Sequence, residues 1–272
     1  GLFYDINSFH SLYASWAVGN KEPNRNDYTE SSPQSRPLPE TLYDYELGYQ
    51  LNRRNFRLGA NLYYMDYKNQ LVLTGELNDV GAATRTNIED SYRRGIELMA
   101  TWRPVEKLRI NANATFSQNK IKDFTEYVDN WETGEQIELQ YENTDIAFSP
   151  SVIAGSEITY VPLHIQKSQG LGHKLSLSLI SKYVGKQYID NTSSDSRSID
   201  PYLVNDVRLT YNLKNLLFKE IGFTLLVRNV LDEEYEANAW VYRFYSEGQY
   251  QKFDGYFPQA GINFLAGLTV KF

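Results

Sequence analysis

Long stretches of this sequence alternate between apolar and polar side chains, and this alternation constrains the fold more than any other feature. In "LRINANATFSQNK" (Leu108 to Lys120), every second residue from Leu108 to Phe116 is apolar, and the residues between them are polar. Successive side chains of a β-strand point to opposite sides, so a period of two predicts a strand with one apolar and one polar face. The open question is what each face contacts.

The same alternation recurs along the whole chain and predicts eleven strands. They lie near residues 1–6, 9–20, 41–52, 55–72, 87–102, 107–122, 146–161, 173–188, 200–213, 219–230 and 258–272. Most exceed the ~5–6 residues of an ordinary globular strand and reach the ~9–11 residues with which a tilted strand crosses a bilayer. No helical period is long enough to form a second layer.

The predicted connections alternate between short and long. The short ones are "NSF", "NRRN", "PVEK" and "KNLLFK", with a somewhat longer one at "LHIQKSQGLGHK". The long polar ones cover residues 20–40, 75–86, 123–145, 190–198 and 231–257. Short turns at one end and long loops at the other are typical of an antiparallel barrel of the outer membrane.

Composition excludes several other classes of protein. The 272 residues contain no cysteine, which removes disulfides, thiolate nucleophiles and cysteine metal sites, and no apolar run approaches the ~18 residues of a membrane-spanning helix. The net charge of −7 and the lack of a basic run argue against a nucleic-acid partner. Because the chain opens with "GLFYDIN", without Met or a leader, we expect a processed product or a fragment.

A soluble β-sandwich also alternates, with its apolar face toward a core. Here the strands are long and uniform, and the polar face is rich in Asn, Ser, Thr, Gly and Gln, which suit a wet interior. We therefore predict an all-β, antiparallel transmembrane β-barrel whose apolar face contacts lipid and whose polar face lines the lumen. Aromatic residues near the ends of the apolar faces are expected to form girdles: Tyr43, Tyr49, Tyr64, Trp102, Tyr160, Tyr183, Tyr211 and Phe272.

Several stretches resemble the barrel of the TonB-dependent outer-membrane receptors. They are "SWAVGNKEPNRNDY" (15–28), "LPETLYDYELGY" (38–49), "ANLYYMDYKNQLVLTGELNDVG" (60–81), "SYRRGIEL" (91–98), "VRNVLDEEYE" (227–236) and the ending "GINFLAGLTVKF". The resemblance implies that residues 1–272 form the C-terminal part of a 22-stranded barrel, with the plug domain and the TonB box outside this chain. It also implies a bacterial outer-membrane location, with the long loops extracellular.

The motifs look most like the iron- and siderophore-receptor branch of that family. The expected function is therefore TonB-coupled import of a ferric siderophore or another iron complex, without enzymatic activity. The expected partners are TonB, the lipid bilayer with its lipopolysaccharide, the plug domain and a small-molecule or iron-complex ligand. The alternatives left open are a cobalamin, haem or oligosaccharide importer and, in other classes, an outer-membrane barrel enzyme, a passive porin or an adhesin.

Two sets of residues are candidates for recognition. Loop aromatics and an arginine can hold a flat or anionic ligand by stacking, cation–π contact and bidentate hydrogen bonds: Tyr127, Trp131, Trp240, Tyr242, Arg243, Tyr245 and Tyr250. Charged residues on polar strand faces are expected to face the plug: Arg57, Arg93, Arg109, Arg208, Arg228, Glu46 and Glu97.

We expect no catalytic residues, no metal site and no cofactor. The three histidines, His10, His164 and His173, are scattered and lack metal-ligand spacing, and no nucleophile stands beside a base. In "NVLDEEYE" (229–236), a structural turn is favoured over a calcium site at Asp232, Glu233 and Glu234.

Overall fold

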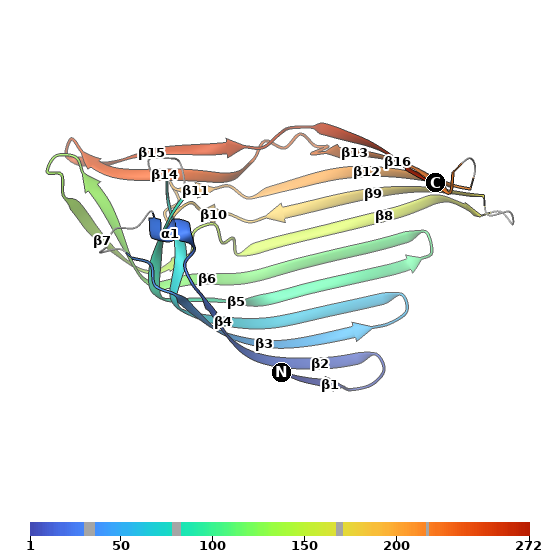
Figure 1. Cartoon of the computed structure of the whole chain (residues 1–272), viewed down its shortest axis with the longest axis horizontal. Helices are drawn as coiled ribbons and strands as arrows, with labels where there is room; N and C mark the ends of the chain where they lie inside the picture. Colours follow the sequence, from blue (N-terminus) through green and yellow to red (C-terminus); the bar gives the residue numbers. More distant parts are fainter. Residues whose placement is uncertain (30–35, 78–82, 167–170, 216–217) are drawn as a thin grey trace.

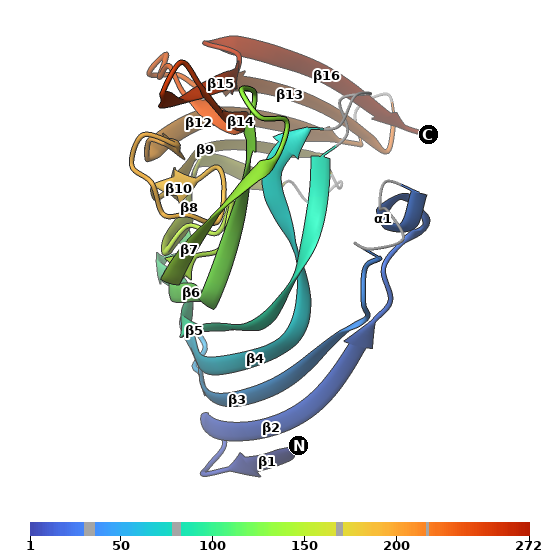
Figure 2. The ribbon, with the colours of Figure 1, turned by 90° about the vertical axis from the view of Figure 1, so that its left-hand side faces the viewer.

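The computed structural model describes residues 1–29, 36–77, 83–166, 171–215 and 218–272. Its main feature is one large, curved, open sheet with the strand order β1-β2-β3-β4-β5-β6-β8-β9-β12-β13-β16 (Figures 1 and 2). The bounds of these strands are β1 Leu2–Asp5, β2 His10–Lys21, β3 Glu40–Asn52, β4 Phe56–Leu77, β5 Ala83–Val105, β6 Leu108–Asn130, β8 Val152–Gln166, β9 Gly172–Val184, β12 Tyr202–Lys214, β13 Glu220–Arg228 and β16 Asn263–Lys271. All neighbours along this order pair antiparallel, and the all-β antiparallel prediction is confirmed.

Each of the eleven predicted strands corresponds to one strand of this order, but two predicted loops are partly strand. The expected loop 123–145 is a hairpin, because β6 continues to Asn130 and pairs with β7 (Gln136–Asp145). Alternating apolar residues at Ile137, Leu139 and Tyr141 carried that signal. The expected loop 231–257 likewise contains the hairpin of β14 (Glu236–Ser246) and β15 (Gln249–Pro258).

Other predicted boundaries shift because tertiary contacts decide them. The strand expected from residue 146 begins at Val152, since the Ala147 N–H donates to the side chain of Asn191 and Phe148 adopts a positive φ of 52°. The expected strand 173–188 ends at Val184, and its last part forms a separate two-stranded ladder of β10 (Gln187–Tyr188) and β11 (Ser198–Ile199). Parts of four expected connections, residues 30–35, 78–82, 167–170 and 216–217, lie outside the described residues.

The two ends of the sheet differ, as the sequence predicted. Figure 1 shows turns at one end, whereas β7, β10, β11, β14, β15 and the short helix α1 (Arg25–Thr29) gather at the other. Within the described residues, no helix has the length and apolar character needed to cross a membrane.

Register places apolar residues of neighbouring strands side by side on one face. Leu47 pairs with Leu62, Leu62 with Ile96, and Ile96 with Phe116. These side chains are not packed into a core: Leu47 is 52% exposed and Leu62 is 51% exposed. A single-layered sheet that leaves such a row uncovered on its convex side has the surface of a membrane-facing wall.

The compact apolar clusters lie instead at the end of the sheet that carries the long connections, and the first is formed mainly by β4, β5 and β6. One contains Val72, Ile88, Ile121, Phe124 and Ile146. Another contains Ile189, Ile199, Ala239 and Val241. Side-chain packing therefore orders the end with the long connections, while the hydrogen-bond ladder between strands orders the wall.

Gly95 marks a place where the wall admits no side chain. A Cβ at this position would lie 2.3 Å from the Phe116 carbonyl oxygen and 2.8 Å from the Tyr63 hydroxyl. Because the first contact is with backbone, we expect Gly95→Ala to lower barrel stability by about 1–3 kcal/mol. Heat-modifiable electrophoretic mobility measures the loss, and Gly267→Ala, whose Cβ meets nothing within 4 Å, is the matched control.

Candidate functional site

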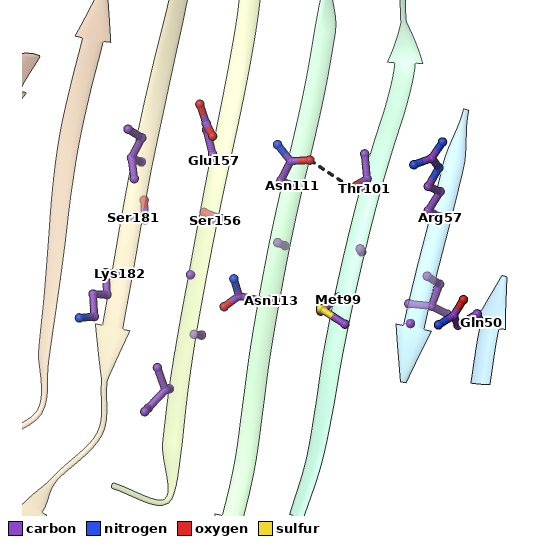
Figure 3. A pocket seen from close by; sticks show the side chains of 18 of the residues that line it. Gln50, Arg57, Met99, Thr101, Asn111, Asn113, Ser156, Glu157, Ser181 and Lys182 are labelled. Atoms are coloured by element: carbon purple, nitrogen blue, oxygen red, sulfur yellow. Dashed lines mark hydrogen bonds between the residues drawn. The ribbon is translucent and has the colours of Figure 1, made fainter. Parts of the chain in front are cut away.

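The concave face of the sheet, called the lumen wall below, carries an open hollow of about 660 Å³ (Figure 3). Strand register builds it from two adjacent rows of residues. One row runs from Arg57 through Thr101 and Asn111 to Glu157, and the Thr101 hydroxyl donates to Asn111 Oδ1 at 3.1 Å. The next row places Asn113 between Met99 and Gly155. Apart from Met99 and Gly155, these are polar positions of the period-two pattern, so the alternation in the sequence produces most of the hollow's chemistry.

A second hollow of about 680 Å³ lies on the same wall, nearer the short turns. Its charged lining residues are Arg103, Lys107, Arg109, Lys174, Arg208, Glu106 and Glu157. Arg208 forms a salt bridge with Glu157, and Arg109 Nε donates to Asn111 Oδ1 at 3.2 Å. Cations exceed carboxylates here, so this part of the wall is positively charged although the whole chain is acidic.

The long connections are joined into one body, which we call the loop cap (residues 123–151, 185–201 and 229–262). The end of β14 pairs with β6 at Asp129 and Asn130, and the Trp131 N–H donates to the Tyr245 carbonyl at 2.9 Å. Lys252 Nζ donates to the Ser196 carbonyl at 2.6 Å. Segments far apart in the sequence therefore make direct contact at one end of the sheet (Figure 1).

Aromatic rings stack on the outer part of the loop cap. Trp131 lies 4.0 Å from Phe244, centroid to centroid, and its Nε1 donates to the Tyr242 hydroxyl at 3.2 Å. That hydroxyl donates to Asp129 Oδ2 at 2.7 Å. Trp131 is still 54% exposed, so one face of the cluster remains open to a ligand.

A network of buried charges lies in the same loop cap. Arg197 Nη1 donates to Glu126 at 2.6 Å and to Asp190 at 2.5 Å, and each of these three side chains is no more than 12% exposed. Arg243 also donates to Glu126, at 2.7 Å. Burial lowers the pKa of Arg197, but the carboxylates of Asp190 and Glu126 raise it further, so its pKa lies above the usual value. The guanidinium therefore stays charged and joins the connection 185–201 to β6.

Similarity to known proteins identifies the family to which this chain belongs. The family model for the TonB dependent receptor-like β-barrel matches residues 1–230. The chain belongs to that family. β-Barrels of TonB-dependent receptors are outer-membrane proteins, and the family consists of transport receptors rather than enzymes, which confirms the resemblance and the expected lack of enzymatic activity.

Solved structures share the fold of this receptor barrel. The siderophore receptor PiuA from Acinetobacter baumannii is 18% identical, with a TM-score of 0.68 over 98% of this chain and 34% of its own. The ferric-catecholate import receptor Fiu from E. coli K12 is 17% identical, with a TM-score of 0.63 over 97% of this chain and 33% of its own. The copper transporter OprC is 15% identical, with a TM-score of 0.67 over 98% of this chain and 38% of its own.

The chain thus spans little more than a third of the length of these proteins. At identities this low, the similarity concerns the fold of the receptor barrel and not its cargo. None of the curated proteins matches the sequence significantly.

The residues predicted to face the lumen lie at several different places on the receptor barrel. Arg57 lines the first hollow, while Arg109 and Arg208 line the second. Glu46 accepts from the Ser15 hydroxyl at 3.3 Å on β3, and Glu97 lies in register with Asn61 and Thr115 on β5. Arg93 donates to Ser149 at 3.0 Å, and Arg228 pairs in register with Asn263.

The predicted ligand residues gather in the loop cap, but they are not equally available. Tyr127, Trp131 and Tyr250 are exposed. The Arg243 guanidinium is occupied, because it also donates to the Tyr141 hydroxyl at 3.2 Å and lies 4.3 Å from the centre of the Tyr250 ring. The remaining members, Trp240, Tyr242 and Tyr245, are partly buried. The Trp240 indole lies directly over Gly255, where it leaves no room for a side chain. Tyr242 contacts the Trp131 ring, and Tyr245 packs edge-on against Tyr250.

Sequence reasoning missed the buried network of Asp190, Arg197 and Glu126. The connection 190–198 was predicted only as a polar loop, yet Asn191 is fully buried and donates to the Leu73 carbonyl at 2.7 Å. The spacing Asp190-x-Thr192 carried a local signal, because the Asp190 carboxylate accepts from the Thr192 N–H at 3.1 Å. Nothing local to "DNTSSDSR" indicates its partners on β4 and β6.

The histidines and the "NVLDEEYE" segment make ordinary structural contacts. His10 and His173 each hydrogen-bond a tyrosine hydroxyl at 2.7 Å, to Tyr49 and Tyr211 respectively. Asn229 exchanges two 2.9 Å hydrogen bonds with the backbone of Glu233, which closes a turn. Across the described residues, no group of three or more His, Cys, Asp or Glu side chains is arranged to hold a metal ion.

Proposed function

We propose that this chain forms part of the barrel and the extracellular loop cap of a TonB-coupled importer for a scarce nutrient, with a ferric siderophore or other iron complex as first choice. The observation that carries the proposal is the separation of three surfaces: an exposed apolar face, a charged lumen wall, and an aromatic cap at one end only. The family match separates this chain from a passive porin or an adhesin.

The choice of cargo rests on what the structural neighbours are called. PiuA is a siderophore receptor and Fiu a ferric-catecholate import receptor. Flat aromatic faces at Tyr127, Trp131 and Tyr250 suit stacking against a planar chelator. Because OprC has the same fold and is a copper transporter, a copper complex is the control cargo. Cobalamin, haem and oligosaccharides are the other cargoes to compare.

The remaining parts of the proposal follow from the same arrangement. The loop cap faces the outside of the cell, and residues 1–272 supply the C-terminal half of a 22-stranded barrel. Arg57, Arg93, Arg109, Arg208, Arg228, Glu46 and Glu97 contact the plug domain through polar bonds, and TonB couples the import to energy. Trp131 and its neighbours hold the complex before it passes the plug.

Uptake of labelled ferric siderophore by cells that produce the complete gene product tests this function. We expect uptake that rises with the receptor, disappears in a strain without TonB and is not matched by a labelled copper complex. An immunoblot of outer membranes is expected to show more receptor in iron-starved than in iron-replete cells. Uptake that does not depend on TonB would contradict the proposal. So would the absence of ferric-siderophore uptake together with a receptor level that does not respond to iron.

A further inference from the structure

The second hollow of the lumen wall lies where the strand ladder is irregular in two places. The register between β5 and β6 shifts at "WRPV" (102–105), and the register between β8 and β9 shifts at "YVPL" (160–163). Each segment contains a proline, which cannot donate to the ladder. Arg103 and Val161, within the two shifts, both line the hollow. Breaks in the ladder are common at barrel rims and beside active sites, so this level of the wall departs from a plain membrane-spanning ladder.

Three cations of this hollow lack a carboxylate partner. Arg103, Lys107 and Lys174 line it, and none of the three forms a salt bridge with a described residue. The two other arginines of the lining are already engaged within the wall, as described above. Five cations and two carboxylates line the hollow, so the lining has a net positive charge.

The neighbouring parts of the lumen wall do not cancel this charge. The charged neighbours are, toward the short turns, Lys214, Glu220 and Lys271 and, toward the loop cap, Arg57, Lys182, Asp206 and Arg228. Five of them are cations and two are carboxylates. The acidic residues Asp44, Glu46 and Glu97 lie farther toward the loop cap, on β3 and β5. The positive charge therefore belongs to this part of the wall, in a chain whose net charge is −7.

Small polar side chains form the floor between the cations. They are Thr159, Ser176, Ser178, Thr210, Asn212 and Thr224, and the hydroxyl oxygens of Thr159 and Ser178 lie 2.8 Å apart. They leave a volume of about 680 Å³, which is within the ~300–1,000 Å³ of small-molecule sites. Long, flexible cations above hydroxyl groups offer a charged solute several weak contacts, as a solute that must leave again requires.

We propose that Arg103, Lys107 and Lys174 form a transit site for the anionic groups of the imported complex, at the end of the lumen opposite the loop cap. Iron complexes of deprotonated catechol or carboxylate groups carry a net negative charge, and flexible cations attract such a solute without fixing it in one geometry. The inference rests on the proposed function, in which an iron complex is the cargo. It adds the charge of that cargo and a contact site separate from the aromatic rings of the loop cap.

Uptake of a labelled ferric tricatecholate complex by cells that produce the complete gene product separates transit from capture. We expect the triple variant Arg103→Gln, Lys107→Gln, Lys174→Gln to bind the complex at the cell surface like wild type. It is expected to import the complex about tenfold more slowly, within the range by which electrostatic attraction changes rates. The charge-conserving variant Arg103→Lys, Lys107→Arg, Lys174→Arg is expected to import like wild type.

The matched control is the triple variant Arg53→Gln, Arg54→Gln, Lys219→Gln. It removes the same charge at short turns, and none of its three residues lines either hollow. We expect this control to import like wild type. Unchanged import by the first triple variant, or an equal loss in the control, would overturn the transit site.

Binding of pyrophosphate to the purified complete receptor in mild detergent tests the site independently of the cargo. We expect binding that weakens as salt rises and that is about tenfold weaker in the triple variant of Arg103, Lys107 and Lys174. A wild type that binds pyrophosphate in this way but imports no ferric complex supports the anion site and contradicts only the proposed cargo. Equal binding by wild type and triple variant, as expected if carboxylates of the plug domain permanently engage these cations, would overturn the site.

Discussion

Arg197→Ala is expected to destabilise the loop cap by about 3–5 kcal/mol, because it leaves the buried carboxylates of Asp190 and Glu126 without their shared cation. Burial already raises the pKa of Asp190 against the opposing pull of Arg197 and Thr192, so removal of the guanidinium favours protonation or exposure of that carboxyl. The connection 185–201 would then separate from β6. Limited proteolysis and hydrogen exchange of the purified receptor measure the loss.

The matched control is Lys186→Ala in the same connection. Lys186 pairs with Asp195, whose side chain is 82% exposed, so the loss is expected to be much smaller than for Arg197→Ala. The wall should keep its protection from exchange in both variants, since its strands are held by backbone pairing. Equal effects of the two substitutions would show that the buried network does not hold the loop cap.

Ala112→Arg is expected to cost about 2–4 kcal/mol and to reduce the amount of assembled receptor, because it places a charge in the middle of the lipid-facing surface. Ala112 is the register partner of Ala100 and Ser156, four residues along β6 from Phe116 in the row of apolar side chains. The measurement is the amount of heat-modifiable receptor in outer membranes.

The adjacent residue provides the control, because neighbours on a strand face opposite sides. Asn113 lines the first hollow on the lumen wall, where Arg meets water, so Asn113→Arg is expected to change assembly by less than about 1 kcal/mol. Similar membrane levels of both variants would contradict the assignment of the convex face to lipid.

The wall was predictable from the sequence because its structure follows from a local rule. A period of two decides which of Asn111 and Ala112 faces the lumen, and no distant contact has to be known for that. Hence the eleven strands, the two faces and the difference between the two ends could all be predicted. Arg57 and Arg109 could be assigned to the polar face on the same grounds.

The loop cap could not be predicted in the same way, because its order comes from contacts between distant segments. Asn191 is buried only because Leu73 and Ala147, far away in the sequence, supply its hydrogen-bond partners. Arg243 looks free for a ligand in "AWVYRFYSEGQ", but Glu126 on β6 engages it. Residue type alone therefore does not show which side chains of the loop cap are already engaged in contacts within the protein.

The apolar clusters lie at the end of the sheet that carries the long connections, and the rest of the wall is held by backbone pairing. A substitution in the loop cap that does not touch these clusters is expected to leave the strand register unchanged, because the strands of the wall pair through their backbones. A lineage can therefore change the surface of the cap while the wall keeps its pairing. Such a division allows barrels of one architecture to diverge toward different nutrients at low sequence identity.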